Sequence, residues 1–216
     1  MARDPGEPRS RYAYNAEANR YVNRATGRFV ARAEIRRAID AALDNAGRRT
    51  RALAEQLRAR EITLREWQLE MREVVKSVQL YSAAAAKGGW AELTSQDTGR
   101  VGQMVRQQYA YLQRFAEQIE RGQQPLDGRF ARRAMLYAQA GRAAYHLTER
   151  EEMRARGFDR EANILAASDH CDLCVSETER GPVPIGSLIP IGQRTCMVNC
   201  RCRIRYLNSR TGEIAA

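Results

Sequence analysis

The five cysteines of this chain all lie in its last quarter, at spacings that could bind a metal ion. Cys171 and Cys174 are separated by two residues, and Cys196, Cys200 and Cys202 fall within seven positions. Thiolates at C-x2-C and C-x-C spacing can converge from two turns onto one tetrahedral ion, and zinc prefers sulfur ligands of this kind. We therefore expect a structural zinc site in this part of the chain.

Five cysteines exceed the four positions of a tetrahedral zinc site. Cys171 and Cys174 form a natural first pair, since two intervening residues let the backbone turn around the ion. Cys200 and Cys202 are expected to project from the same face of an extended segment. We predict Cys171, Cys174, Cys200 and Cys202 as the ligands, with Cys196 as the alternative fourth ligand.

A disulfide framework, with a pairing such as Cys171 to Cys202, is the competing interpretation and would be typical of a secreted or periplasmic protein. The first residues, Met1 to Gly6, lack the apolar run that a signal peptide needs. Cysteines kept in a reducing cytoplasm bind metal more often than they pair. Zinc is therefore the preferred hypothesis.

The sequence gives little support for catalytic chemistry. It contains no G-x4-G-K-[ST] loop, G-x-S-x-G elbow or H-E-x-x-H pair. His170 directly precedes Cys171 and is a weaker candidate ligand, while His146 is expected at a surface or core position of a helix. Glu149 and Glu152 share a helix face rich in arginine, which is typical of solvated ion pairs. A zinc hydrolase would need an open metal position and a nearby base, so we expect no enzyme.

The net charge of +10 is concentrated at the N-terminal end. Residues 1–60 carry +7, residues 61–157 carry +3, and residues 158–216 are neutral overall. A zinc module that gripped DNA would bring a surplus of positive charge, so any nucleic-acid contact is expected from the N-terminal region, although Arg201, Arg203 and Arg205 alternate along one predicted strand face. No stretch approaches the ~20 apolar residues of a membrane span, and no membrane association is expected.

The pattern before residue 158 predicts a mainly α fold, either a long-helix bundle or a helical hairpin array. Apolar residues recur every three or four positions, and Thr63 and Glu66 have the form of a capping box. Residues 1–18 are rich in Pro, Gly and Arg and are expected to form a flexible basic arm. The domain over 19–157 is expected to contain a small hairpin at 20–30 and helices at about 31–60, 63–87, 97–121 and 128–156.

Residues 158–216 differ in composition and are expected to form a small β-rich module resembling a zinc knuckle. Pro182, Pro184 and Pro190 stand among glycines and argue against a helix in that loop. The segment 204–207 is β-prone and predicts a closing strand. A core this small would need a staple such as a metal ion.

The order of these parts resembles the phage head morphogenesis, or minor capsid, family named after the F protein of phage Mu. The matching motifs are Asp169-His170-Cys171-Asp172-Leu173-Cys174, a loop rich in Pro and Gly, and Asn199-Cys200-Arg201-Cys202 followed by a strand. Residues 158–207 carry the resemblance, and the helices before them match only by type. Where the family has His-Pro before Asn-Cys-Arg-Cys, this chain has Met197-Val198, and Cys196 could replace the missing histidine as a ligand.

The resemblance implies a virion protein without catalytic activity, made in the cytoplasm of the bacterial host. It would act in head assembly, DNA packaging or delivery near the portal, in an oligomeric particle. The implied partners are the portal or other head proteins, with non-specific contact to packaged DNA through the basic N-terminal region. A cytoplasmic nucleic-acid-binding zinc protein is the alternative, which the +7 charge of residues 1–60 permits.

Overall fold

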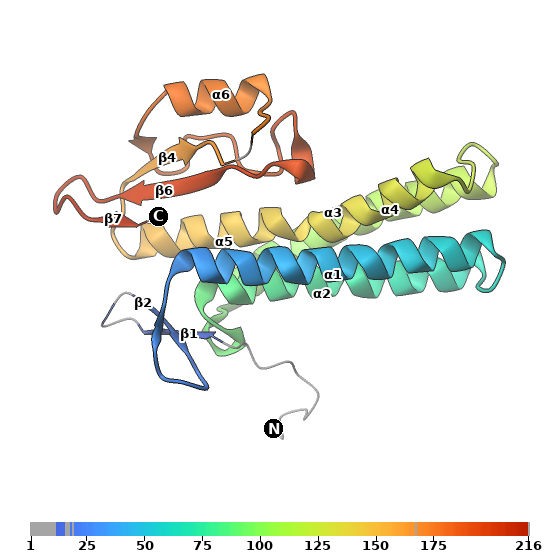
Figure 1. Ribbon diagram of the computed structural model, residues 1–216, viewed down its shortest axis with the longest axis horizontal. Coiled ribbons are helices and arrows are strands. Elements are labelled where there is room, and N and C mark those ends of the chain that lie inside the picture. The colour runs from blue at the N-terminus through green and yellow to red at the C-terminus, as the bar shows by residue number, and fades with distance from the viewer. Residues whose placement is uncertain (1–11, 16–17, 19, 167, 216) are drawn as a thin grey trace.

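The computed structural model describes residues 12–215, except residues 16, 17, 19 and 167, and confirms the mainly α fold. A long helical body carries a small sheet and a compact C-terminal module (Figure 1). Both lie toward the end of the body where α1 begins, on opposite sides of the helices (Figure 1). Among the described residues, no helix is both long enough and apolar enough to cross a membrane.

Five helices form the body, in close agreement with the predicted bounds for the first three. They are α1 (Arg32–Arg58), α2 (Leu64–Lys87), α3 (Ser95–Glu120), α4 (Gly128–Gln139) and α5 (Gly141–Ala155). Helix α2 packs against α1, α3 and α5, while α4 packs mainly against α1. At the centre, the rings of Trp67, Phe115 and Phe130 have centroids 5.5–5.6 Å apart and are fully buried.

Reciprocal capping fixes where two of these helices begin. The Thr63 hydroxyl accepts from the Glu66 amide at 3.2 Å, and the Glu66 carboxylate accepts from the Thr63 amide at 2.7 Å, so the predicted capping box is confirmed. Thr94 and Asp97 form the same motif at the start of α3. A short 3-10 turn, Trp90–Glu92, connects α2 to α3.

The helix predicted over residues 128–156 is in fact two helices, α4 and α5, which meet at Ala140. They separate because α4 packs on α1 whereas α5 packs on α2. A Cβ atom at Gly141 would lie 2.8 Å from a methyl of Leu43 and 3.0 Å from the carbonyl oxygen of Val78. The missing side chain therefore lets α5 approach α1 and α2 closely.

The N-terminal sheet is antiparallel, with strand order β1 (Tyr12–Asn15), β2 (Arg20–Asn23) and β3 (Phe29–Val30). The hairpin predicted at 20–30 is formed by β2 and β3, and Gly27 in its turn has a φ of 66°. The arm predicted over 1–18 is too long, because β1 pairs with β2; its first eleven residues lie outside the described part of the chain. The Tyr21 hydroxyl donates to the Ala86 carbonyl at 2.6 Å and ties the sheet to the end of α2.

A buried ion pair joins the first turn of α1 to α5. Glu149 is 1% exposed, and its carboxylate accepts from Arg32 at 3.2 Å and from the Tyr145 hydroxyl at 2.8 Å. The prediction that Glu149 lies on a solvated face is wrong, since tertiary packing places that face of α5 against α1. His146, one turn earlier, is also buried, with its Nδ1 3.6 Å from Glu149.

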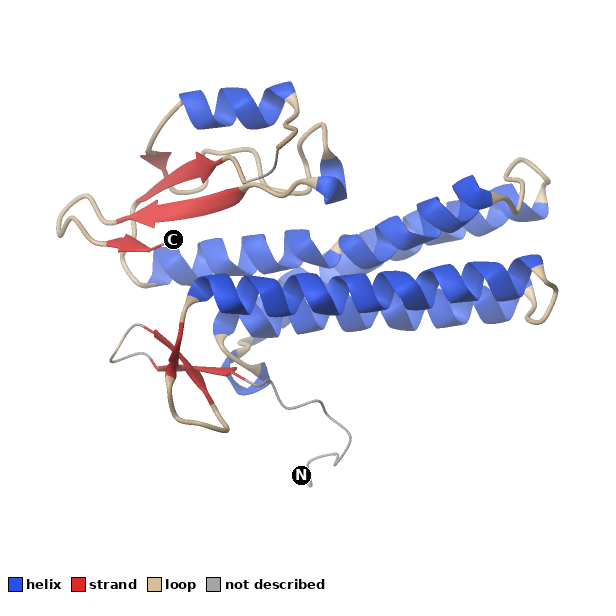
Figure 2. Ribbon diagram, viewed as in Figure 1, coloured by secondary structure: helices blue, strands red, loops and turns tan. Residues whose placement is uncertain are grey.

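The C-terminal module is a four-stranded antiparallel sheet with one helix. Its strands run in the order β5 (Val183–Pro184), β4 (Arg160–Ile164), β6 (Arg203–Leu207) and β7 (Ile214–Ala215). The strand predicted at 204–207 is confirmed by β6, but the sequence pattern did not predict α6 (Asp172–Glu179), which packs on β4 (Figure 2). The module has a hydrophobic core separate from that of the helical body, and it includes Cys174, Cys200 and Cys202.

Candidate metal centre

The first two cysteines lie at the start of α6. Cys171 immediately precedes the helix, and the Cys174 amide donates to its carbonyl oxygen at 2.9 Å. This tight turn directs the C-x2-C pair to one end of the helix. The first half of the site is therefore built on a helix start and not on a β-type knuckle.

The other three cysteines lie on the segment that leads into β6. Cys196 and Cys200 flank a short 3-10 turn, Met197–Asn199. Cys200 and Cys202 are both buried while Arg201 between them is exposed, so they share one face of an extended segment, as the spacing predicted. The alternation continues into β6, where the apolar residues face the core of the module.

All five predicted cysteines come together, and each has a free thiol. Among the described residues, two groups of three have sulfur atoms within 4.8 Å of one another: Cys171, Cys174 and Cys196, and Cys174, Cys200 and Cys202. The Cys174 sulfur is 3.6 Å from those of both Cys196 and Cys200. Sulfurs held about 2.3 Å from a tetrahedral ion would lie about 3.8 Å apart, close to these two separations, so the cluster could bind a metal ion. The predicted set of Cys171, Cys174, Cys200 and Cys202 is divided between the two groups, which share Cys174.

The structure places Cys174 at the centre of this arrangement. It is the member shared by both groups, whereas Cys196, predicted as the alternative ligand, lies as near to it as Cys200 does. His170 belongs to neither group, nor does the buried His146. The cluster in the described part of the chain is therefore made of sulfur alone.

Burial strongly affects the acidity of these thiols. It raises the pKa of Cys174 and Cys202, and it raises the pKa of Cys196 to about 12. Burial also acts on Cys171, but hydrogen bonds from Cys174 and Cys196 outweigh it and lower the pKa of that thiol to about 7. A bound cation would reverse the effect of burial, because coordination deprotonates a thiol.

A buried arginine faces the cluster. Arg194 is only 1% exposed, and its guanidinium lies 3.7 Å from the Cys174 sulfur, in hydrogen-bond contact. The same group donates to the Ile189 carbonyl at 2.9 Å and to the Asn163 side chain at 2.7 Å. No carboxylate among the described residues forms an ion pair with Arg194, so the cysteine sulfur is the one contact that could carry a negative charge.

Asn163 connects this arginine to the helix that carries Cys174. Its amide nitrogen donates to the Cys174 carbonyl at 3.1 Å and to the Thr178 hydroxyl at 2.7 Å, while its oxygen accepts from Arg194. Sequence reasoning missed both residues. The available signal for Arg194 is an arginine in the Pro/Gly loop two positions before Cys196, whereas no sequence pattern singles out Asn163.

Two buried carboxylates accept hydrogen bonds from backbone amides of the Pro/Gly loop. Glu161 accepts from the amides of Gly186 and Leu188, both at 2.9 Å, and pairs with Arg150 at 2.9 Å. Glu177 accepts from the Ile189 amide at 2.9 Å and pairs with Arg180. Neither belongs to the sulfur groups, so both carboxylates position the loop that carries Arg194.

Comparisons with protein-family models, with curated proteins and with solved structures find no match to this chain. The interpretation of the site therefore depends on its own residues and geometry.

Proposed function

We propose that the cysteine cluster binds one structural zinc ion that holds the C-terminal module together. The observation that carries this proposal is the buried Arg194 against the Cys174 sulfur. A buried guanidinium without a counter-charge is costly. Four thiolates around a zinc dication carry a net charge of about −2, which supplies that counter-charge.

Several features support a structural ion over a catalytic one. Every ligand atom in both groups of described residues is a cysteine sulfur, which is typical of closed structural zinc sites, whereas catalytic zinc sites keep an open position. The nearest buried carboxylates, Glu161 and Glu177, are engaged by backbone amides and arginines. We therefore propose no enzymatic reaction at this centre.

Metal analysis of five single variants tests the ligand set. Each of Cys171, Cys174, Cys196, Cys200 and Cys202 is changed to serine in turn, and zinc per chain is measured after purification. We expect zinc to be lost from the serine variants of Cys171, Cys174, Cys200 and Cys202. The Cys196→Ser variant is expected to retain it. The control is Val175→Ser, which adds the same side chain at a partly exposed position of the same helix. Full zinc retention in Cys174→Ser would contradict the proposal.

We further propose that the chain is a minor head protein of a tailed bacteriophage, acting in head assembly, DNA packaging or delivery near the portal. Support comes from the cysteine motifs over residues 158–207, and a helical body with a small stapled module is consistent with a structural role. The partners would be the portal or other head proteins in the virion. The test is proteomic analysis of purified particles, with a gene deletion beside it. The proposal predicts a few copies per DNA-filled head and a lower titre in the deletion, and absence from the heads with an unchanged titre would contradict it.

A cytoplasmic nucleic-acid-binding zinc protein is the second candidate, favoured by the +7 charge of residues 1–60. A salt titration separates the two. A specific binder would prefer one sequence at physiological salt, whereas a head protein would bind without preference and lose affinity steeply as salt rises.

A further inference from the structure

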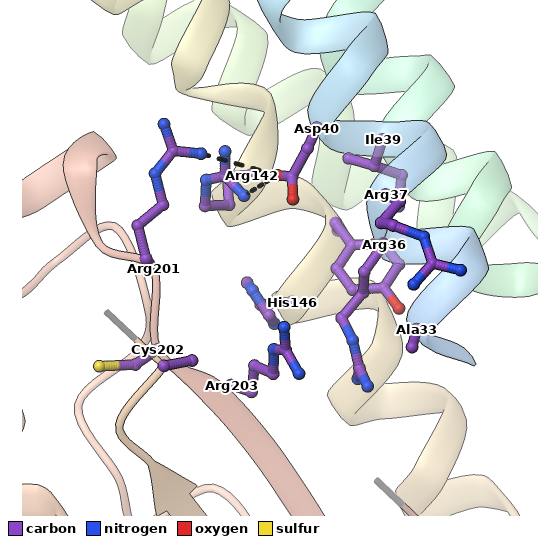
Figure 3. Close-up of a pocket in the computed structure, with 12 residues that line it drawn as sticks. Ala33, Arg36, Arg37, Ile39, Asp40, Arg142, His146, Arg201, Cys202 and Arg203 are labelled. Carbon is purple, nitrogen blue, oxygen red and sulfur yellow. Dashed lines mark hydrogen bonds and ion pairs between the residues drawn. The ribbon is translucent and has the colours of Figure 1, made fainter. Parts of the chain in front are cut away.

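A cavity of about 310 Å³ lies where the helical body meets the C-terminal module. Its walls come from the first turns of α1, from α5, and from the segment that enters β6 (Figure 3). We call it the junction pocket and define its charged wall as Arg36, Arg37, Asp40, Arg142, Arg201 and Arg203. The volume is at the lower end of the range for small-molecule sites.

The charge of the junction pocket is strongly unbalanced. Five guanidinium groups line it, and Asp40 is the one carboxylate in its wall. Asp40 is shared, since it is hydrogen-bonded to Arg142 and also lies 3.7 Å from Arg201 (Figure 3). Arg36, Arg37 and Arg203 form no ion pair with any carboxylate among the described residues.

Nearby acidic groups do not restore the balance. Glu149 is already engaged by Arg32 and Tyr145 and lies 3.6 Å from the His146 Nδ1. It acts on Arg36 electrostatically, but the two form no ion pair. Burial lowers the pKa of His146, so this ring adds no charge at neutral pH. The excess of positive charge therefore remains on the arginines.

Some donors at the junction pocket also lack partners. Arg142 is 8% exposed, and its Nε atom is buried without a hydrogen-bond acceptor among the described residues; the same holds for Nε of Arg36. A buried donor left unpaired is destabilising, because it has lost its hydrogen bonds to water. Figure 3 shows Arg203 and His146 reaching toward the same space between α5 and the segment before β6. An anionic ligand would instead meet the pocket-lining guanidinium groups that form no ion pair among the described residues.

We propose that the junction pocket binds a phosphate group. Guanidinium forks match phosphate oxygens in pairs, and a phosphate group presents negative charge on more than one acceptor oxygen to several arginines at once. The group could belong to a free compound such as pyrophosphate or to a phosphodiester of DNA, which share this chemistry. Because its arginines come from both body and module, the bound phosphate would clamp one to the other. The proposal does not depend on the phage assignment, and the helical circular dichroism signal checks the folding of the variants whether or not zinc is bound.

The test is calorimetric titration of pyrophosphate into the full chain at constant ionic strength, with sodium chloride as the matched blank. In the double variant Arg36→Gln/Arg203→Gln we expect at least tenfold weaker binding. The control Arg106→Gln/Arg205→Gln removes the same charge from exposed sites outside the pocket and should bind as the parent does. An unchanged zinc content and helical circular dichroism signal would show that the pocket variant is folded.

A second titration uses a short DNA duplex and identifies the source of the phosphate. Competition between duplex and pyrophosphate, lost in the pocket variant, would assign a phosphodiester. Pyrophosphate binding that the duplex does not displace would assign a free phosphate compound. Equal binding of pyrophosphate by the pocket variant and the control variant, or no heat beyond the chloride blank, would overturn the proposal.

Discussion

At the scale of single residues, the main feature of the C-terminal module is the contact between the buried guanidinium of Arg194 and the buried sulfur of Cys174. The Arg194 guanidinium donates hydrogen bonds to the Asn163 side-chain oxygen, which orients it, and to the Cys174 sulfur at the centre of the cluster. Partners behind metal ligands of this kind orient them and tune metal affinity. If the cysteines bind zinc as proposed, Arg194 and Asn163 would therefore contribute to the zinc affinity of the module.

Arg194→Met tests this dependence. The variant keeps the volume but removes the charge that faces the sulfur cluster, so we expect zinc affinity to fall about 10- to 100-fold. Competition with a chromophoric chelator measures that affinity. The control is Arg210→Met, an exposed arginine of the same module. Equal zinc affinity in the two variants would contradict the role given to Arg194.

The cysteines could be predicted from the sequence because their spacing is local, whereas Arg194 and Asn163 could not. These two residues are 31 positions apart and meet only through the fold of the Pro/Gly loop. Glu149 is a second residue whose environment could not be predicted from its neighbours in sequence. Its neighbours in sequence indicated a solvated face, but contact with α1 buries it.

At the scale of elements, local sequence signals predicted where helices begin, but they did not predict a helix break that depends on packing. The capping box at Thr63 depends on residues within one turn, and it predicted the start of α2. The break at Ala140 depends on which helices α4 and α5 pack against. The apolar periodicity runs through that break without a gap, so the sequence pattern predicted one helix.

Gly141→Ala tests the close approach at that break. The added methyl would meet Leu43 at 2.8 Å and the Val78 carbonyl at 3.0 Å, so we expect the free energy of unfolding to fall by about 1–3 kcal/mol. Urea denaturation measures it. Gly99→Ala in α3 is the matched control, since nothing lies within 4 Å of its added Cβ, and it should stabilise by about 0.5–1 kcal/mol. Equal effects of the two changes would contradict the packing described here.

Glu149→Gln tests the buried ion pair between α1 and α5. Burial acts to raise the pKa of Glu149, but His146 and Arg32 outweigh it and hold this pKa below its ordinary value of 4.5. A carboxylate with a lowered pKa contributes stability above its ordinary pKa and loses it as the pH falls through the lowered value.

We therefore expect the variant to be less stable than the parent by about 3 kcal/mol at pH 7. The difference should be constant above about pH 6 and narrow below about pH 4.5. Chemical denaturation across this range measures it. A difference that grows on acidification would contradict the sign.

At the scale of the whole molecule, the chain has two separate hydrophobic cores. One fills the helical body and the N-terminal sheet. The other fills the module, where it includes three of the cysteines, and it also includes Met153 of α5. Arg150 and Arg154 of α5 tie the two together through the carbonyls of Leu188 and Ile185, both at 3.2 Å. Three of the cysteines belong to the core of the module, so a metal bound by them would stabilise the module more than the body.

Removal of metal should therefore unfold the module and spare the body. With a strong chelator, we expect amides of residues 158–215 to lose protection from hydrogen exchange, while those of α1 to α3 keep theirs. The measurement is hydrogen exchange followed by mass spectrometry, with the same chelator presaturated with zinc as control. Uniform loss of protection along the chain would contradict the separation of the two cores.

X-ray absorption at the zinc edge tests the central claim of a sulfur-bound structural zinc most directly. The purified protein should contain about one zinc per chain, with four sulfur neighbours at about 2.3 Å and no lighter ligand in the first shell. A metal-free protein with oxidised cysteines, or a zinc with an oxygen ligand in its first shell, would contradict it.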